Sequence, residues 1–143
     1  MTDYMDMSTT STKTKTDAHA KAKRRATVIC TREDRILLVS KDELRWALPG
    51  GRPDKGESPA DAAGRELFEE TGIKARKLTF LFEFTGATTL HYVFMTRLDE
   101  LARATPRNEI AHCRWLASGN LTDLAISPTT RQIVRNALAL AGE

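Results

Sequence analysis

The chain has 143 residues, with a hydrophobic fraction of 41%, a charged fraction of 29% and a formal net charge of +3. This length provides one domain, and this balance of residue types is that of a globular protein. The positive charge fits a protein that attracts anionic ligands, but it is too small to indicate a nucleic-acid-binding protein. No apolar run approaches the roughly 18 residues of a membrane span, and the first 20 residues contain no hydrophobic centre of a secretory signal.

The chain contains two cysteines, Cys30 and Cys113, each within an apolar run that is typical of a strand. We predict two reduced, packed thiols, in preference to a disulfide or a pair of zinc ligands. Since the chain shows neither a secretory signal nor a membrane span, we expect a cytoplasmic protein with no membrane partner.

Residues 1–23 are rich in Ser, Thr and Lys and show no hydrophobic period, so we predict a disordered or loosely attached tail. Its lysines could form a nucleic-acid-binding arm, but Asp3, Asp6 and Asp17 dilute their charge. We therefore favour a solvated tail and expect no stable nucleic-acid partner. The folded domain is predicted to occupy residues 24–143.

Short β-branched and apolar runs predict several strands. Residues 24–31 and 35–40 flank a turn-prone segment and indicate a pair of strands. Apolar and other residues alternate through residues 78–97 around Gly86, which is typical of a hairpin. A further short apolar run covers residues 112–117.

Two segments carry helix signals. Residues 58–71 begin with Ser58 as a cap followed by proline, and Gly72 stands where a left-handed residue ends a helix. Residues 127–141 begin with the same Ser-Pro pair and carry one apolar stripe. Strands mixed with two helices predict an α+β protein, arranged as an α/β/α sandwich in which helices flank a mixed sheet.

The stretch RELFEETG, residues 65–72, crowds three glutamates onto one side of the first helix. Glu66, Glu69 and Glu70 stand at offsets of zero, three and four, where like charges destabilise a helix. A divalent cation would compensate this repulsion, and oxygen ligands without His or Cys favour Mg²⁺ over zinc. A solvated charged helix with ion pairs such as Arg65 to Glu69 is the alternative interpretation.

The neighbouring side of this helix is small and apolar, and we expect it to pack against the sheet. The side consists of Ala60, Ala63, Gly64, Leu67 and Phe68. Because glycine in a helix interior costs about 1 kcal/mol relative to alanine, Gly64 predicts a close backbone approach.

The residues before the helix form a glycine-rich loop, which allows backbone groups to approach a ligand closely. Loop and helix together have a fixed spacing: Gly51, five residues, Glu57, seven residues, Arg65-Glu66-Leu67, one residue, Glu69-Glu70, one residue, Gly72-Ile73. This pattern matches the signature of the Nudix hydrolases, the Nudix box, at every fixed position. The chain resembles that family from about residue 24 to residue 141.

The resemblance implies the Nudix fold and hydrolysis of a nucleoside diphosphate linked to another moiety, with Mg²⁺ or Mn²⁺ as cofactor. It implies that Glu66, Glu69 and Glu70 bind the metal ion, together with the backbone carbonyl of Gly50. Dimers are common in the family, so a homodimer is compatible with the resemblance.

The resemblance also implies supporting roles near the carboxylates. Arg65 resembles the arginine that orients them, and Glu57 resembles a supporting acid or an additional metal contact. A further acid often lies outside the box, and we choose Glu109, although the family has no fixed motif there. Glu66 is the preferred general base, with Glu69 and Glu109 as alternatives.

Residues outside the box determine the substrate in this family. We predict contacts from Gly51 and Arg52 of the loop, and we name Trp46 and Tyr92 as candidates for stacking or polar contacts, with a place in the core or rim of the domain as the alternative. A compact domain favours a nucleoside triphosphate. The alternatives are dinucleoside polyphosphates, ADP-ribose, a non-nucleotide diphosphate, or a non-catalytic protein that senses a nucleotide.

Overall fold

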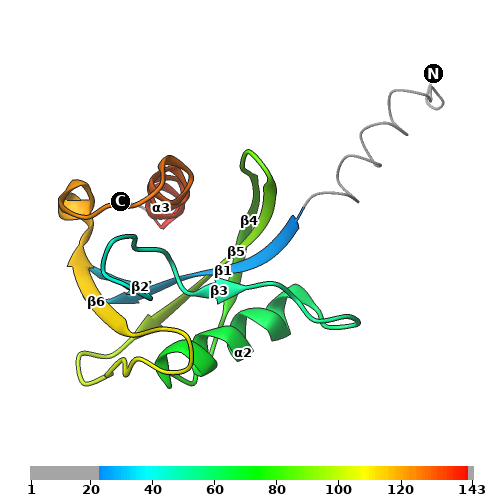
Figure 1. The fold of residues 1–143 in the computed structure, drawn as a ribbon, viewed down its shortest axis with the longest axis horizontal. Helices are drawn as coiled ribbons and strands as arrows, with labels where there is room; N and C mark the ends of the chain where they lie inside the picture. Colours follow the sequence, from blue (N-terminus) through cyan, green and yellow to red (C-terminus); the bar gives the residue numbers. More distant parts are fainter. Residues whose placement is uncertain (1–22, 142–143) are drawn as a thin grey trace.

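The computed structural model describes residues 23–141 (Figure 1). Its elements in chain order are β1 Lys23–Arg32, β2 Arg35–Ser40, β3 Gly50–Gly51, α2 Pro59–Thr71, β4 Thr79–Thr85, β5 Thr89–Leu98, β6 His112–Ala117, the short helix η1 Ser118–Asp123 and α3 Pro128–Leu140. The predicted tail lies outside the described residues, apart from Lys23 at the start of β1.

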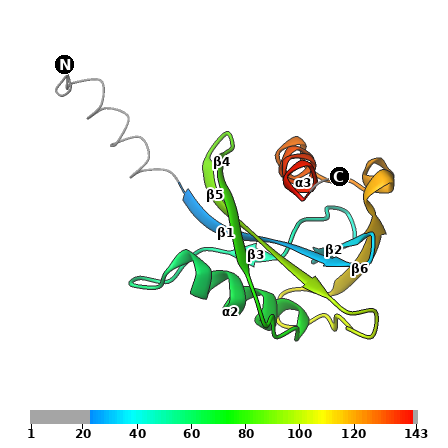
Figure 2. The same ribbon diagram turned by 180° about the vertical axis from the view of Figure 1, so that it is seen from behind.

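The strands form one mixed sheet in the order β4-β5-β1-β2-β6, and β3 pairs with β1. The predicted strand pair is confirmed as the antiparallel pair β1 and β2, and the predicted hairpin as β4 and β5. β1 and β5 run parallel over ten residue pairs. Helices α2 and α3 lie on opposite faces of the sheet (Figures 1 and 2), which confirms the predicted sandwich.

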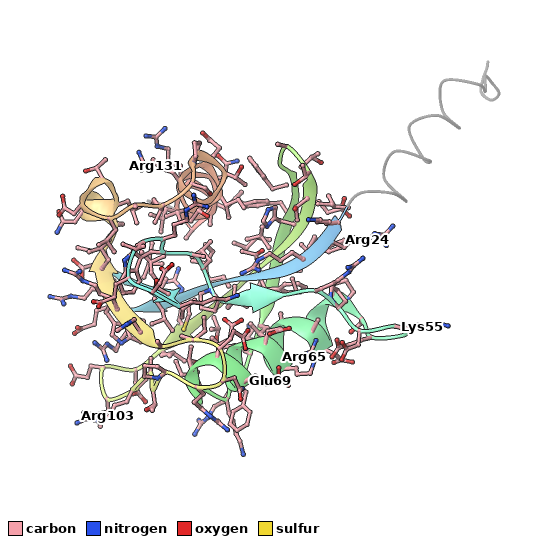
Figure 3. The ribbon with its side chains drawn as sticks, viewed as in Figure 1. Arg24, Lys55, Arg65, Glu69, Arg103 and Arg131 are labelled. Atoms are coloured by element: carbon pink, nitrogen blue, oxygen red, sulfur yellow. The ribbon has the colours of Figure 1, made fainter. Side chains whose placement is uncertain are left out.

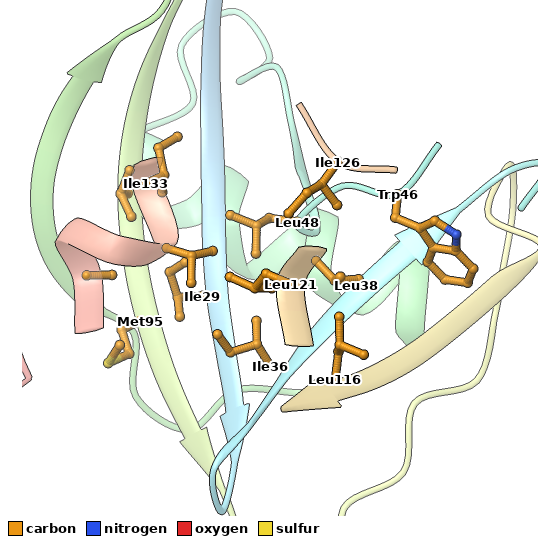
Figure 4. Packing of buried hydrophobic residues seen from close by; sticks show 13 residues of the cluster. Ile29, Ile36, Leu38, Trp46, Leu48, Met95, Leu116, Leu121, Ile126 and Ile133 are labelled. Carbon is orange, nitrogen blue, oxygen red and sulfur yellow. The ribbon is translucent and has the colours of Figure 1, made fainter. Parts of the chain in front are cut away.

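Side chains of β1 alternate between two cores, one on each face of the sheet. Ile29 joins the core beneath α3, together with Leu38, Ile133 and Val134 (Figure 4). The α2 side contains Ala26, Val28, Cys30, Leu37 and Leu67. Because both faces of the central strands are covered, β1 and β2 read as nearly continuous apolar runs.

Both predicted helices begin and end as their sequence signals indicate. The Ser58 hydroxyl accepts a hydrogen bond from the Asp61 N–H at 3.0 Å, and Gly72 ends α2 with φ 74°. The Ser127 hydroxyl accepts from the Thr130 N–H at 3.0 Å at the start of α3. Serine satisfies an otherwise unpaired helical N–H, and glycine tolerates the left-handed turn, so both caps stabilise the helix ends.

The predicted packing face of α2 is partly wrong. Ala60 is exposed, and Phe68 lies half-buried under the cations of Lys74 and Arg107. The buried residues of α2 are Ala62, Ala63, Leu67, Glu70 and Thr71. The face is rotated because the Gly50–Gly51 strand packs beside α2 and covers the side that carries Glu70.

The close backbone approach predicted at Gly64 is also wrong. A Cβ atom at this position would meet only the Leu78 Cδ1 atom, at 3.5 Å, which is ordinary van der Waals contact. Between residues 23 and 141, no helix has the length and apolarity needed to cross a membrane. Cys30 and Cys113 are free thiols, as predicted.

Candidate active site

The glycine loop is anchored on β1. Gly50 and Gly51 pair with Thr27 and Ala26, and the Val28 N–H donates to the Pro49 carbonyl at 2.9 Å. A Cβ atom on Gly50 would overlap the Ala26 carbonyl oxygen, and one on Gly51 would overlap the Glu66 carboxylate. Glycine is therefore required at position 50 for the loop to lie against β1, and at position 51 for the Glu66 carboxylate to keep its place beside the loop.

Three carboxylates meet beside this loop. Glu66 and Glu70 project from α2, Glu109 projects from the β5–β6 loop, and one oxygen of each lies within 4.8 Å of the others. Glu70 is only 4% exposed, and the one hydrogen bond that its carboxylate accepts within residues 23–141 is a long contact of 3.3 Å from the Gly50 N–H. Like charges at such short separations repel strongly where water is excluded.

Burial raises the pKa of Glu70 to about 7, although the Gly50 N–H and the Arg25 cation oppose this shift. Burial also raises the pKa of Glu66, and the charge of Arg65 lowers it. A divalent cation would offset the cost of burying charged carboxylates, and it would also neutralise the repulsion between them. The cleft that contains the cluster is lined by neither His nor Cys, so the donor set fits Mg²⁺ or Mn²⁺ and not zinc.

Arg65 ties the loop to the helix. Its Nε and Nη2 atoms donate to the two oxygens of Glu57 at 2.8 and 2.9 Å, and Nη1 donates to Glu66 at 3.2 Å and Glu69 at 3.1 Å. The hydrogen bonds from Arg65, followed by the Asp54 N–H, lower the pKa of Glu57 to about 2. Arg65 thus fixes the Glu66 carboxylate at the edge of the cluster.

Glu69 occupies a different position from the other two box carboxylates. Its side chain is 46% exposed and bonds to Arg65, and Glu69 is not part of the three-carboxylate cluster (Figure 3). Glu57 is likewise engaged by Arg65 and the Asp54 N–H. Of the predicted metal ligands, the structure therefore brings together Glu66, Glu70 and Glu109, and it places them next to Gly50.

The segment from Thr105 to Glu109 reaches the cluster by binding the last turn of α2. The Thr105 N–H donates to the Thr71 carbonyl at 2.9 Å, and the Arg107 N–H donates to the Glu70 carbonyl at 3.1 Å. The Asn108 amide donates to the Glu69 carbonyl at 2.7 Å. The last carbonyls of a helix have no partner within the helix, so this segment satisfies them and places Glu109 opposite Glu66 and Glu70.

The cluster lies in a cleft of about 480 Å³ whose lining also contains four cations, one further acid, Asp42, and apolar side chains. The predicted residues Gly51 and Arg52 line it, together with three cations that sequence reasoning missed: Arg25, Lys41 and Arg45. Arg25 is half-buried and donates to the Leu48 carbonyl at 2.9 Å, just before the glycine loop. The sequence does contain a signal for Arg25, because this charged residue directly precedes the apolar part of a predicted strand.

The two predicted aromatic contacts lie elsewhere. Trp46 is 6% exposed and belongs to the core beneath α3 (Figure 4), so its ring presents no free face to the cleft, and the predicted contact from Trp46 is not supported. Tyr92 is half-buried and lines a neighbouring hollow of about 320 Å³ with Arg24, Arg52 and Glu57. Tyr92 therefore borders the predicted substrate region without lining the acidic cleft.

A glycine loop, an acidic helix face and a cationic rim that meet in one cleft are the features of a site for a divalent cation and an anionic ligand. A family profile described as the NUDIX domain matches residues 21–137. The chain belongs to the Nudix family.

Particular relatives support this assignment. A protein of Mycobacterium tuberculosis provisionally named 8-oxo-dGTP diphosphatase 3 is 34% identical over 91 residues, which cover 58% of this chain and 42% of that protein. Diphosphoinositol polyphosphate phosphohydrolase 2 of Rattus norvegicus is 36% identical over 86 residues, 55% of this chain and 48% of that protein. The chain thus matches less than half the length of either relative.

A solved structure from Chromobacterium violaceum, provisionally described as a Nudix hydrolase family member, has the same fold. It superposes with a TM-score of 0.75 at 30% sequence identity, over 85% of this chain and 80% of that chain.

Proposed function

We propose that this protein is a Nudix hydrolase that cleaves a phosphoric anhydride with Mg²⁺ or Mn²⁺ as cofactor. The observation that carries the proposal is the cluster of Glu66, Glu70 and Glu109 at the centre of a cleft with a cationic rim. These carboxylates, with the adjacent Gly50 carbonyl, would hold the cation. When bound, a divalent cation neutralises phosphate charge and stabilises the leaving oxygen.

The residues of the chain would orient the substrate and accept a proton. Arg25, Lys41 and Arg52 line the cleft, where they can pair with phosphate oxygens. Glu66 remains the preferred general base, because burial raises its pKa towards the working range while Arg65 holds the carboxylate in place. Glu109, at the exposed rim, and Glu69, beside Arg65, are the alternatives.

For the substrate we propose a nucleoside triphosphate or related nucleotide, in line with the provisional name of the mycobacterial relative. A second candidate is a highly phosphorylated molecule without a base. It is favoured by one observation: four cations and no aromatic side chain line the acidic cleft, within the part of the chain that the structure describes. Nucleobases are commonly held by stacking on aromatic rings, whereas polyphosphates need cations. The name of the rat relative points to the same class of molecule.

A substrate panel tests the proposal. Release of phosphate or pyrophosphate is measured from dGTP, 8-oxo-dGTP, ADP-ribose and a diphosphoinositol polyphosphate, each with Mg²⁺, with Mn²⁺ and with EDTA. Metal-dependent turnover that is lost in Glu70→Gln supports the hydrolase. Binding of a nucleotide without turnover of any substrate would instead identify a sensor, and metal-independent turnover would refute the assigned role of the carboxylates.

We also propose a cytoplasmic location, supported by the two free thiols. A homodimer and a domain boundary at residue 24 stay predictions. Light scattering of the purified protein measures its oligomeric state, and limited proteolysis followed by mass spectrometry locates the domain boundary.

A further inference from the structure

A second and larger concavity, of about 910 Å³, lies away from the acidic cleft, and no residue lines both. Its walls are the segment after α2, the start of β4, the end of β5 with the loop that follows, and the last turn of α3. Figure 3 shows Arg103 of this region projecting at the end of the molecule opposite Lys55. We refer to this concavity as the basic groove; its lining residues lie within 73–81, 95–103 and 140–141, and Phe80 and Glu100 of these ranges are not among them.

The charge of the basic groove is strongly one-sided. Its cations are Lys74, Arg76, Lys77, Arg97 and Arg103, and its one acid is Asp99. Among residues 23–141, none of these five cations forms an ion pair. Five like charges in one concavity repel each other, although Lys74 also lies over the Phe68 ring, so they favour an anionic occupant.

Apolar side chains accompany these charges. Leu101 and Leu140 are 82% and 63% exposed, and both line the basic groove, with Leu81 and Met95 deeper in it. Large apolar side chains that gather at a concave surface mark an interaction site more often than a solvated one. An occupant must therefore supply apolar groups as well as negative charge.

The basic groove also contains a free sheet edge. Within the described part of the chain, β4 is the terminal strand and pairs only with β5, and its residues Thr79 and Leu81 line the groove. The pairing of β4 with β5 is irregular between Phe80 and Phe82. An exposed edge offers unpaired N–H and C=O groups to an added strand, and side chains of such a strand alternate between two sides.

We propose that the basic groove binds an extended segment of a partner protein in which acidic and apolar residues alternate. The backbone of the segment pairs with β4, its apolar side chains contact Leu81 and Leu101, and its acids face the lysines and arginines. Among residues 23–141, no aromatic ring lines the groove, so these residues provide no stacking surface of the kind that single-stranded nucleic acid uses. A second copy docked symmetrically would set the cations of both copies against each other.

The test uses the full chain and three fluorescein-labelled probes: a ten-residue peptide of alternating Glu and Val, its Lys-Val counterpart, and a ten-nucleotide RNA. Fluorescence anisotropy at 50 and 300 mM NaCl measures their affinities. We expect the Glu-Val peptide to bind and the other two to bind at least tenfold more weakly. Amide shifts of Thr79 and Leu81 in NMR spectra should report strand addition, which adhesion by charge alone would not produce.

Charge-reversal variants distinguish the effect of the cations in the groove from the effect of the overall charge of the protein. Arg76→Glu with Lys77→Glu should weaken peptide binding at least tenfold. The matched control, Arg114→Glu with Arg135→Glu, removes the same charge at exposed positions outside the groove and should leave affinity within twofold. Leu101→Ser should weaken binding at both salt concentrations. Equal losses in the two charge variants, tighter binding of the RNA, or no binding of the Glu-Val peptide at 1 mM would each overturn the proposal.

Discussion

Replacing Gly51 by alanine should remove activity while preserving the fold, because the new methyl group would collide with one flexible side chain. A Cβ atom at this position would overlap the Glu66 carboxylate and lie 2.9 Å from Glu66 Cγ. Carbon atoms pack best at roughly 3.5–4.0 Å, so Glu66 must move by about 1 Å. A misplacement of about 1 Å can cost on the order of 100-fold in rate. We therefore expect kcat for the best substrate of the panel to fall about 100-fold.

Gly50→Ala is the matched comparison. A Cβ atom there would overlap the Ala26 carbonyl and lie 3.1 Å from the Thr27 Cα atom, on a backbone with φ 153°, so rigid main chain is affected and the fold itself is destabilised. Steady-state kinetics, Mg²⁺ titration and thermal unfolding of both variants test this contrast. The reasoning fails if Gly51→Ala keeps wild-type kcat, or if its Tm falls as far as that of Gly50→Ala.

Three further substitutions test the remaining features of the site and helix. Since the pKa of Glu70 is about 7 in the folded state and near 4.5 when unfolded, the metal-free folded protein binds more protons between these values, and its stability falls as pH rises across them, by about 3 kcal/mol. Urea unfolding in EDTA at pH 5 and pH 8 should show this fall in the free energy of unfolding for the wild type and little of it for Glu70→Gln. An equal change between the two pH values in both proteins would contradict the argument. Arg65→Lys keeps the charge but loses the bidentate hydrogen bond to Glu57, and we expect metal affinity or kcat to drop 10- to 100-fold. A Mg²⁺ titration and a kcat that both match the wild type would count against the role of Arg65. Gly64→Ala should stabilise the protein by about 1 kcal/mol in urea unfolding without altering kinetics, and a loss of stability would show that the contact with Leu78 is tighter than 3.5 Å.

Local signals in the sequence predicted the elements well because each depends on neighbouring residues. The serine caps, the glycine that ends α2 and the alternation of the β4–β5 hairpin all act within a few positions. The parallel pairing of β1 with β5 joins residues more than 60 positions apart. No local pattern encodes such a contact, so the sequence indicated a mixed sheet but not its strand order.

The residues of the candidate site also divide into those that local spacing predicts and those that only the packing of distant segments brings to the site. The fixed spacing of the box was sufficient to predict Glu66, Glu70, Arg65 and Glu57 as site residues, because one helix and its preceding loop carry them. The contributions of Arg25 and Lys41 depend on how β1 and the segment after β2 pack around the loop, and the sequence did not indicate them. The face of α2 was misjudged for a related reason: the apolar pattern favoured Ala60 and Phe68, whereas the neighbouring loop decided which side is covered.

The connection between β5 and β6 serves two regions of the molecule. Residues 99–103 form a wall of the basic groove, and six positions after residue 103 the same segment delivers Glu109 to the carboxylates. Between them, the anchoring bonds of Thr105 and Arg107 to α2 hold the segment in place. The same segment is also held by the Arg32 guanidinium, which donates to the Ala102 carbonyl at 2.6 Å, and by the Asn108 amide, which donates to the Glu69 carbonyl at 2.7 Å. If residues 99–103 move when the basic groove is occupied, the affinity of the three carboxylates for a cation would change, and a bound cation would change the affinity of the groove by the same factor.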